Sequence, residues 1–186
     1  MTQIRLSAIS SSPPERRRNL AVSYLELACL LHGLGRRTEA AEPFRKAFEL
    51  EDEDPEVNND LAWLLVTSQE PCLRDDARAL RLAQQAVAAR PESADYRNTL
   101  GVASYRSGDD RSAVTELETA MRLQAGGTPF DWFFLAMAHW RLGNRDEARM
   151  FFNRSVEWMA NRKSHNDELF RIRAEAQAML ADPGQR

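Results

Sequence analysis

Two stretches of the chain repeat one pattern of leucine, glycine and small residues. Residues 100–120 read LGVASYRSGDDRSAVTELETA, and residues 135–155 read LAMAHWRLGNRDEARMFFNRS. In each stretch a small residue follows the first leucine, a glycine comes 8 positions after that leucine, and small residues return after 13 and 20 positions. A unit that recurs near 34 residues is typical of stacked helix-turn-helix hairpins. Because such a stack presents a surface and encloses no pocket, the pattern predicts an all-α binding scaffold.

The pair of a leucine and a small residue marks four units. The pairs are Leu27-Ala28, Leu61-Ala62, Leu100-Gly101 and Leu135-Ala136, with spacings of 34, 39 and 35 residues. The matching small residues of the second helices are Ala40, Ala79, Ala113 and Ala148. The five extra residues of the second unit fall in its turn, where added length costs little closure entropy. We predict repeats over about 21–54, 55–93, 94–128 and 129–162, a capping helix over 165–181, a flexible N-terminus over 1–14 and a tail over 182–186.

Local signals support these boundaries. Asp54 and Thr128 each precede a proline and an acidic first turn, and Asp131 is placed for a capping box. Glycines at 35, 108 and 143 are expected to end first helices, because glycine readily takes a positive φ. Small residues at helix crossings allow close approach, so we expect Gly101 to face Ala113 and Ala136 to face Ala148.

Composition limits the classes of function. The chain has 186 residues, 43% of them apolar, and a net charge of -3, which gives no general attraction to nucleic acid. No apolar run reaches the length of a signal peptide or a membrane span. Cys29 and Cys72 fall in a helix and a loop without a C-x-x-C motif, and they suit a reducing compartment. We therefore expect a cytoplasmic protein with no membrane or nucleic-acid partner.

Few residues could carry catalysis. Cys29 and His32 lie three apart on one helix face and could in principle form a nucleophile pair or half of a metal site, but no third ligand or orienting acid is visible. His139 occupies a core-facing position and is expected to be a hydrogen-bonded interior histidine. We predict no enzyme activity, no catalytic residue, no metal site and no cofactor.

The repeated residues resemble the tetratricopeptide repeat over about 20–162. The resemblance rests on Trp132, Leu135, Ala136, Gly143, Ala148, Phe152 and Ser155, and on Leu100, Gly101, Gly108, Ala113 and Ala120. It implies a right-handed α–α superhelix with a C-terminal capping helix, forming a single domain over 15–181. The second unit departs from the pattern because its turn has no glycine. More narrowly, the stretch NNDLAWLLVTSQEPCLRDDARALRLAQQAV and the two repeats after it resemble repeat tails of large bacterial serine/threonine kinases and signalling proteins.

In this family the first helices line a concave surface, and the corresponding stripe is unusually apolar here. Exposed aromatic side chains are costly unless they are covered, so the stripe is predicted to bind a peptide or a partner segment. The asparagines could hydrogen-bond its backbone, and the arginines could receive an acidic end. The candidate residues are Asn59, Trp63, Asn98, Val102, Tyr105, Arg106, Phe133, Met137, Trp140 and Arg141.

Three outcomes remain open for this stripe. A foreign segment binds it, the terminal helix or a neighbouring subunit fills it, or its members are core residues, of which Phe133 is the first candidate. The sequence thus predicts a non-catalytic protein-interaction scaffold. The alternatives are a homo-oligomeric assembly module and a detached regulatory domain of a bacterial kinase-type signalling system. Nucleic-acid binding through the arginines at 16–18 ranks last.

Overall fold

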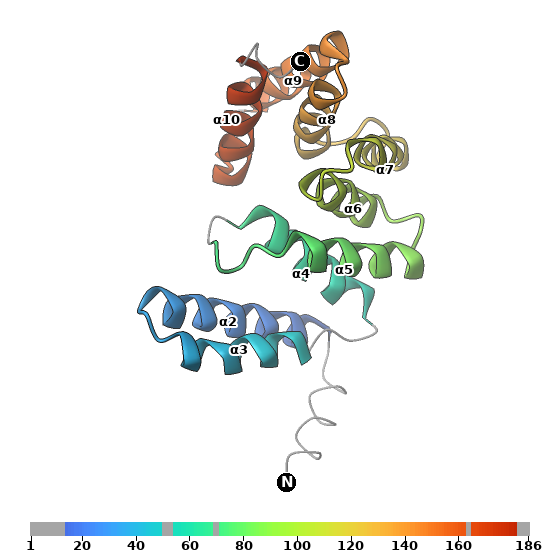
Figure 1. Ribbon diagram of the computed structural model, residues 1–186. Helices are drawn as coiled ribbons and strands as arrows, with labels where there is room; N and C mark the ends of the chain where they lie inside the picture. Colours follow the sequence, from blue (N-terminus) through green and yellow to red (C-terminus); the bar gives the residue numbers. More distant parts are fainter. Residues whose placement is uncertain (1–13, 50–53, 69–70, 163–164, 182–186) are drawn as a thin grey trace. The chain divides into compact units, whose positions relative to one another are not determined.

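The computed structural model describes residues 14–49, 54–68, 71–162 and 165–181. Within those ranges the chain forms nine α-helices and no strand, which confirms the all-α prediction (Figure 1). The helices are α2 (Pro14–Gly33), α3 (Arg37–Glu49), α4 (Pro55–Thr67), α5 (Asp76–Ala89), α6 (Ala94–Arg106), α7 (Asp110–Leu123), α8 (Pro129–Arg141), α9 (Arg145–Arg162) and α10 (Asp167–Ala181). The predicted flexible N-terminus, apart from Pro14, and the predicted tail lie outside the described residues.

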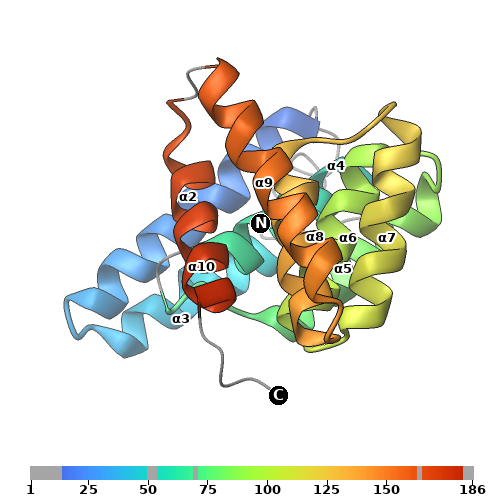
Figure 2. The ribbon, with the colours of Figure 1, turned by 90° about the horizontal axis from the view of Figure 1, so that it is seen from above.

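The helices pair as consecutive hairpins. α2 packs on α3, α4 on α5, α6 on α7 and α8 on α9, and Figure 2 shows the last two pairs side by side. The chain divides into two compact units, residues 1–90 and residues 91–186, which we call unit 1 and unit 2. Unit 1 holds α2 to α5 and unit 2 holds α6 to α10. The prediction of one domain over 15–181 stays a prediction.

Capping groups set the helix boundaries where the local signals predict them. The Asp54 carboxylate accepts the backbone N–H of Glu56 at 3.0 Å, so Asp54 caps α4. At α8, Thr128 and Asp131 form the reciprocal bonds of a capping box. The glycines at 35, 108 and 143 have φ values of 77°, 86° and 85°, and they close the turns of three hairpins.

The crossing of α6 and α7 is close at Gly101. A Cβ atom on Gly101 would lie 2.5 Å from Cγ of Leu117 and 3.2 Å from its backbone nitrogen. Ala113, the expected neighbour, is fully buried on α7, one turn before Leu117. The close approach of the two helices explains the small residue, because Leu117 leaves no room for a side chain at position 101.

We expect Gly101→Val to lower the free energy of unfolding of unit 2 by about 1–3 kcal/mol, because it overpacks this crossing. Gly33→Val, on α2, is the matched control, since a Cβ there would meet no atom within 4 Å. Urea denaturation followed by circular dichroism measures both variants. Equal stability of Gly101→Val and wild type would contradict the close α6–α7 crossing.

Helix α8 is the central helix of unit 2. All ten residues from Asp131 to Trp140 are buried. The helix packs against α6, α7, α9 and α10, which explains why its sequence is apolar almost all round. Any surface that unit 2 presents along α8 is therefore shaped by the helices that surround it.

Candidate functional site

Helix α10 packs against α8, and two of its side chains hydrogen-bond to side chains of α6. Its buried residues are Leu169, Ile172 and Ala176, which are 3%, 5% and 0% exposed and share one helix face. α10 packs mainly against α8 and also against α9, as Figure 1 shows. The predicted capping helix therefore covers part of the predicted partner-binding stripe.

Two residues of α6 contact α10 directly. Arg106 donates two hydrogen bonds to the Glu175 carboxylate, one to each oxygen, and the bond to Oε2 measures 2.8 Å. The Tyr105 hydroxyl donates to Sδ of Met179 at 3.7 Å. Bidentate pairs between arginine and a carboxylate are geometrically specific as well as strong. The contact thus joins an acidic group of an amphipathic helix to an arginine of α6.

Two residues of α8 hold Tyr105 and Arg106 in place. The Phe134 ring meets the Tyr105 ring edge-on at 5.6 Å between centroids, and the Arg106 guanidinium lies 5.2 Å from the Phe134 centroid. The Arg141 guanidinium lies 3.8 Å from the Tyr105 centroid and donates to the Tyr105 carbonyl oxygen at 3.0 Å. We call Tyr105, Arg106, Phe134 and Arg141 the α10-binding face.

Electrostatics fix the protonation state of the tyrosine at this face. Burial raises the pKa of Tyr105 to about 12, and the nearby Arg141 guanidinium opposes that rise. Tyr105 therefore stays a neutral phenol at physiological pH and acts as a hydrogen-bond donor toward α10. Glu175 brings a negative charge to this contact through its ion pair with Arg106.

Asn98 hydrogen-bonds to the cap of α8, and its partner-binding role stays a prediction. Its Nδ2 donates to Oδ1 of Asp131 at 2.7 Å, while Oδ2 of Asp131 accepts the N–H and the hydroxyl of Thr128. Burial raises the pKa of Asp131, and these hydrogen bonds oppose the rise. Asn98 thus supports the buried cap of α8, and this bond occupies a donor that the prediction assigned to a peptide backbone.

Five members of the stripe in unit 2 are buried, which contradicts their expected exposure, and partner binding by them stays a prediction. Val102, Tyr105, Phe133, Met137 and Trp140 are at most 5% exposed. Phe133, Met137 and Trp140 are buried because they lie on α8, which is surrounded by other helices. Tyr105 contacts the terminal helix α10, which helps to explain its burial. Phe133 is a core residue, and its ring packs edge-on against that of Phe152 on α9 at 5.8 Å between centroids.

The stripe members of unit 1 lie on α4. Asn59 is 8% exposed, and its Nδ2 donates to the Asp60 carboxylate at 3.3 Å. Trp63 is half-buried. Partner binding by these two residues stays a prediction.

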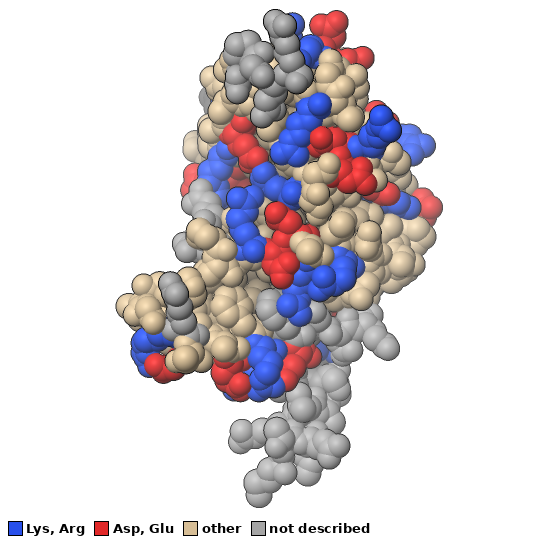
Figure 3. Space-filling model, viewed as in Figure 1, with Lys and Arg blue, Asp and Glu red and all other residues tan. Residues whose placement is uncertain are grey.

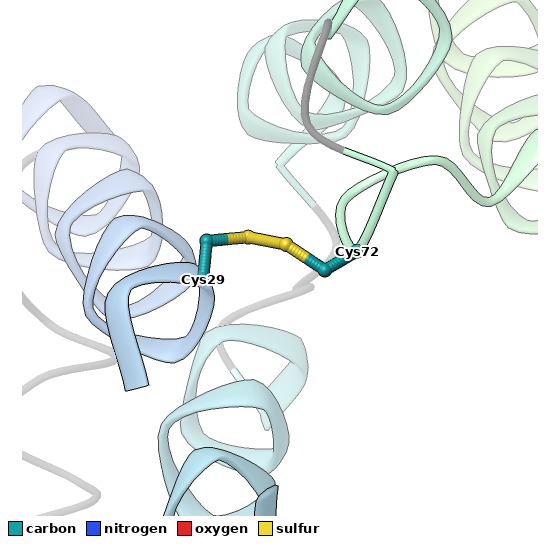
Figure 4. Close-up of a disulfide and its surroundings, with 2 residues drawn as sticks. All are labelled: Cys29 and Cys72. Atoms are coloured by element: carbon teal, nitrogen blue, oxygen red, sulfur yellow. A yellow bond between two sulfur atoms is a disulfide. The ribbon is translucent and has the colours of Figure 1, made fainter. Parts of the chain in front are cut away.

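The two cysteines are joined, which corrects the expectation that they suit a reducing compartment. Cys29 on α2 and Cys72 in the turn between α4 and α5 form a disulfide with their Cα atoms 6.1 Å apart (Figure 4). The five-residue insertion thus carries a cross-link that reaches the first hairpin. In this state Cys29 is no thiol nucleophile, and His32 beside it is exposed. Disulfides persist mainly in oxidising environments.

The interior histidine is confirmed in unit 2. His139 is 8% exposed, its Nδ1 lies 3.1 Å from Nδ2 of Asn144, and its ring stacks on Phe151. Burial lowers the pKa of His139. No cluster of three metal-ligating side chains occurs in the described ranges.

Charge and hydropathy add two further observations. On the face shown in Figure 3, lysine and arginine side chains are interspersed with aspartate and glutamate side chains. Among the helices that the structure describes, none has the length and apolarity required to cross a bilayer.

Comparison with known proteins identifies the family. Tetratricopeptide repeat models match residues 20–50, 73–128 and 132–161, which together span more than half of the chain. The chain is a tetratricopeptide repeat protein, and such repeats are generally non-catalytic interaction modules. No curated protein matches its sequence.

Two solved structures match the chain. The chain is 20% identical to the structure titled MamA MSR-1 C2, with a TM-score of 0.52 over 76% of this chain and 77% of that one. It is 18% identical to PilF of Pseudomonas aeruginosa, with a TM-score of 0.39 over 89% of each chain. The MamA likeness supports a helical repeat superhelix and concerns the fold alone.

Proposed function

We propose that this protein is an interaction scaffold that binds a helical segment of a partner protein on the α10-binding face, in place of α10. One observation carries the proposal: the amphipathic helix α10 already lies on this face. Its apolar side is buried, and its Glu175 pairs with Arg106. The family supplies the general role, since tetratricopeptide repeats bind proteins.

The contacts of α10 define the partner segment by its chemistry. It is an amphipathic helix with apolar residues at the spacing of Leu169, Ile172 and Ala176, and with a carboxylate immediately before the last of them. α10 covers the face from within the same chain, at an effective concentration in the millimolar range for a short connection. A partner therefore binds more tightly when the contact between α10 and the face is weakened.

Glu175→Lys is expected to increase the affinity for a fluorescent peptide with the sequence of residues 165–181. The lysine repels Arg106 and loosens α10, whereas the added peptide keeps its glutamate. Fluorescence anisotropy on the full chain measures the dissociation constant, and we expect a decrease of roughly tenfold, equivalent to about 1.4 kcal/mol.

Glu157→Lys is the matched control, because it makes the same charge change at an exposed position of α9. Its affinity for the peptide should equal that of wild type. Circular dichroism checks that both variants keep their helices. Equal affinities for the two variants, or no peptide binding by either, would refute the proposal.

Four proposals from the sequence concern properties other than the α10-binding face. Trp63→Ala tests whether Trp63 of unit 1 takes part in binding a partner, and the role of Asn59 stays a prediction. Homo-oligomeric assembly, a regulatory role beside a bacterial kinase-type system and a cytoplasmic location stay predictions.

A further inference from the structure

The two hairpins of unit 1 are joined at opposite ends of α2. Near its N-terminal end, Arg17 pairs with Asp54 at 3.0 Å and Arg18 with Asp60 at 3.1 Å. Near its C-terminal end, the Cys29–Cys72 disulfide connects α2 to the turn between α4 and α5.

Helix packing between these hairpins is carried by α2 on α4. In the described residues α3 makes no comparable packing on α4, whereas the corresponding helix of unit 2, α7, packs against α8. The disulfide adds a covalent connection between the C-terminal half of α2 and the second hairpin.

A hollow borders each of the two disulfide-bonded cysteines. Both cysteines are half-buried. A hollow of about 560 Å³ beside Cys29 is lined by Leu30, Leu34 and Leu73 among others, and a second of about 540 Å³ borders Cys72. Leu30 and Leu34 are 66% and 71% exposed, so they do not shield the bond. Exposed disulfides are the ones that exchange readily with thiols.

We propose that the Cys29–Cys72 disulfide is a redox switch that controls whether the C-terminal half of α2 is fixed to the α4–α5 turn. A dithiol reductant supplies two electrons and two protons. Its thiolate attacks one sulfur and forms a mixed disulfide, the other cysteine leaves as a thiolate and is protonated, and the second thiol of the reductant then resolves the mixed disulfide. The products are two protein thiols and a cyclic disulfide of the reductant.

Reduction changes the surface of unit 1 in a defined place. Leu73 follows Cys72 directly, is 6% exposed and lines both hollows. Leu30 and Leu34 are already exposed. When the turn separates from α2, Leu73 becomes exposed as well. The two ion pairs near residues 17 and 18 still hold the N-terminal half of α2. The reduced protein therefore presents a larger apolar surface at one end of this helix only. This switch does not depend on partner binding at the α10-binding face.

Hydrogen–deuterium exchange of the oxidised full chain, before and after addition of excess dithiothreitol, tests the switch. Without denaturant, the bond should open, and exchange should accelerate by about tenfold or more in residues 26–34 and 71–75. Acceleration in residues 16–22 should be much smaller than in residues 26–34, unit 2 should be unchanged, and reoxidation should restore the first pattern. Mass spectrometry after thiol alkylation reports the redox state.

Cys29→Ser/Cys72→Ser provides the control. The variant should show the reduced pattern without dithiothreitol and should not respond to it. A bond that resists dithiothreitol until denaturant is added would overturn the proposal. So would acceleration spread evenly over unit 1, because either result would make the disulfide a purely structural cross-link.

Discussion

Replacing Phe134 by alanine should lower the free energy of unfolding of unit 2 by about 3–5 kcal/mol, the usual cost of emptying a buried phenylalanine site. Phe134 is fully buried on α8, and its ring supports both Tyr105 and Arg106. The cavity would remove the edge-on aromatic contact and the surface on which the Arg106 guanidinium lies. Urea denaturation followed by far-UV circular dichroism measures the loss.

Phe170→Ala is the control for this change. Phe170 lies on α10 and is 46% exposed, so its truncation should cost less than about 1 kcal/mol. Similar losses for the two variants would mean that Phe134 does not organise the α10-binding face. Peptide affinity is also compared between Glu175→Lys and the double variant Glu175→Lys/Phe134→Ala. If Phe134→Ala lowers the stability of unit 2 but leaves this affinity unchanged, Phe134 supports the fold and not the recognition of a helix.

Removing the disulfide should cost unit 1 about 3–5 kcal/mol, because the cross-link closes a loop of intermediate length and limits the unfolded chain. The two cysteines are 43 residues apart in sequence. Trp63 is the only tryptophan of unit 1, so its fluorescence during urea denaturation reports this unit.

The comparison uses oxidised wild type, reduced wild type and Cys29→Ser/Cys72→Ser. The last two should have the same lowered midpoint, and dithiothreitol should not change the variant. If all three samples unfolded at one midpoint, the disulfide would contribute nothing to the equilibrium stability of unit 1.

Local sequence patterns predicted the helices well. The Asp54 cap, the Thr128–Asp131 capping box and the positive φ of Gly108 each depend on residues within a few positions of one another. The spacing of leucine and small residues predicted four hairpins, because one helix pair needs nearly the same length each time. Hydrogen bonds within a turn and helix periodicity are properties that a short stretch of sequence carries.

Contacts between distant residues were not predicted. Arg106 and Glu175 are 69 residues apart, and Cys29 and Cys72 are 43 apart, so no periodic signal pairs them. Arg106 was expected to receive the acidic end of a partner, and in the structure it pairs with Glu175 of α10. A row of aromatic residues on first helices does not distinguish an open surface from one that the chain covers itself.

Hydrogen exchange of α10 during titration with the peptide of residues 165–181 shows directly whether a partner helix and α10 share one face. In full-length wild type, exchange in residues 167–181 should accelerate in proportion to the peptide bound, while α6 stays protected. Saturation with peptide while α10 keeps its original protection would place the bound helix elsewhere and contradict displacement of α10.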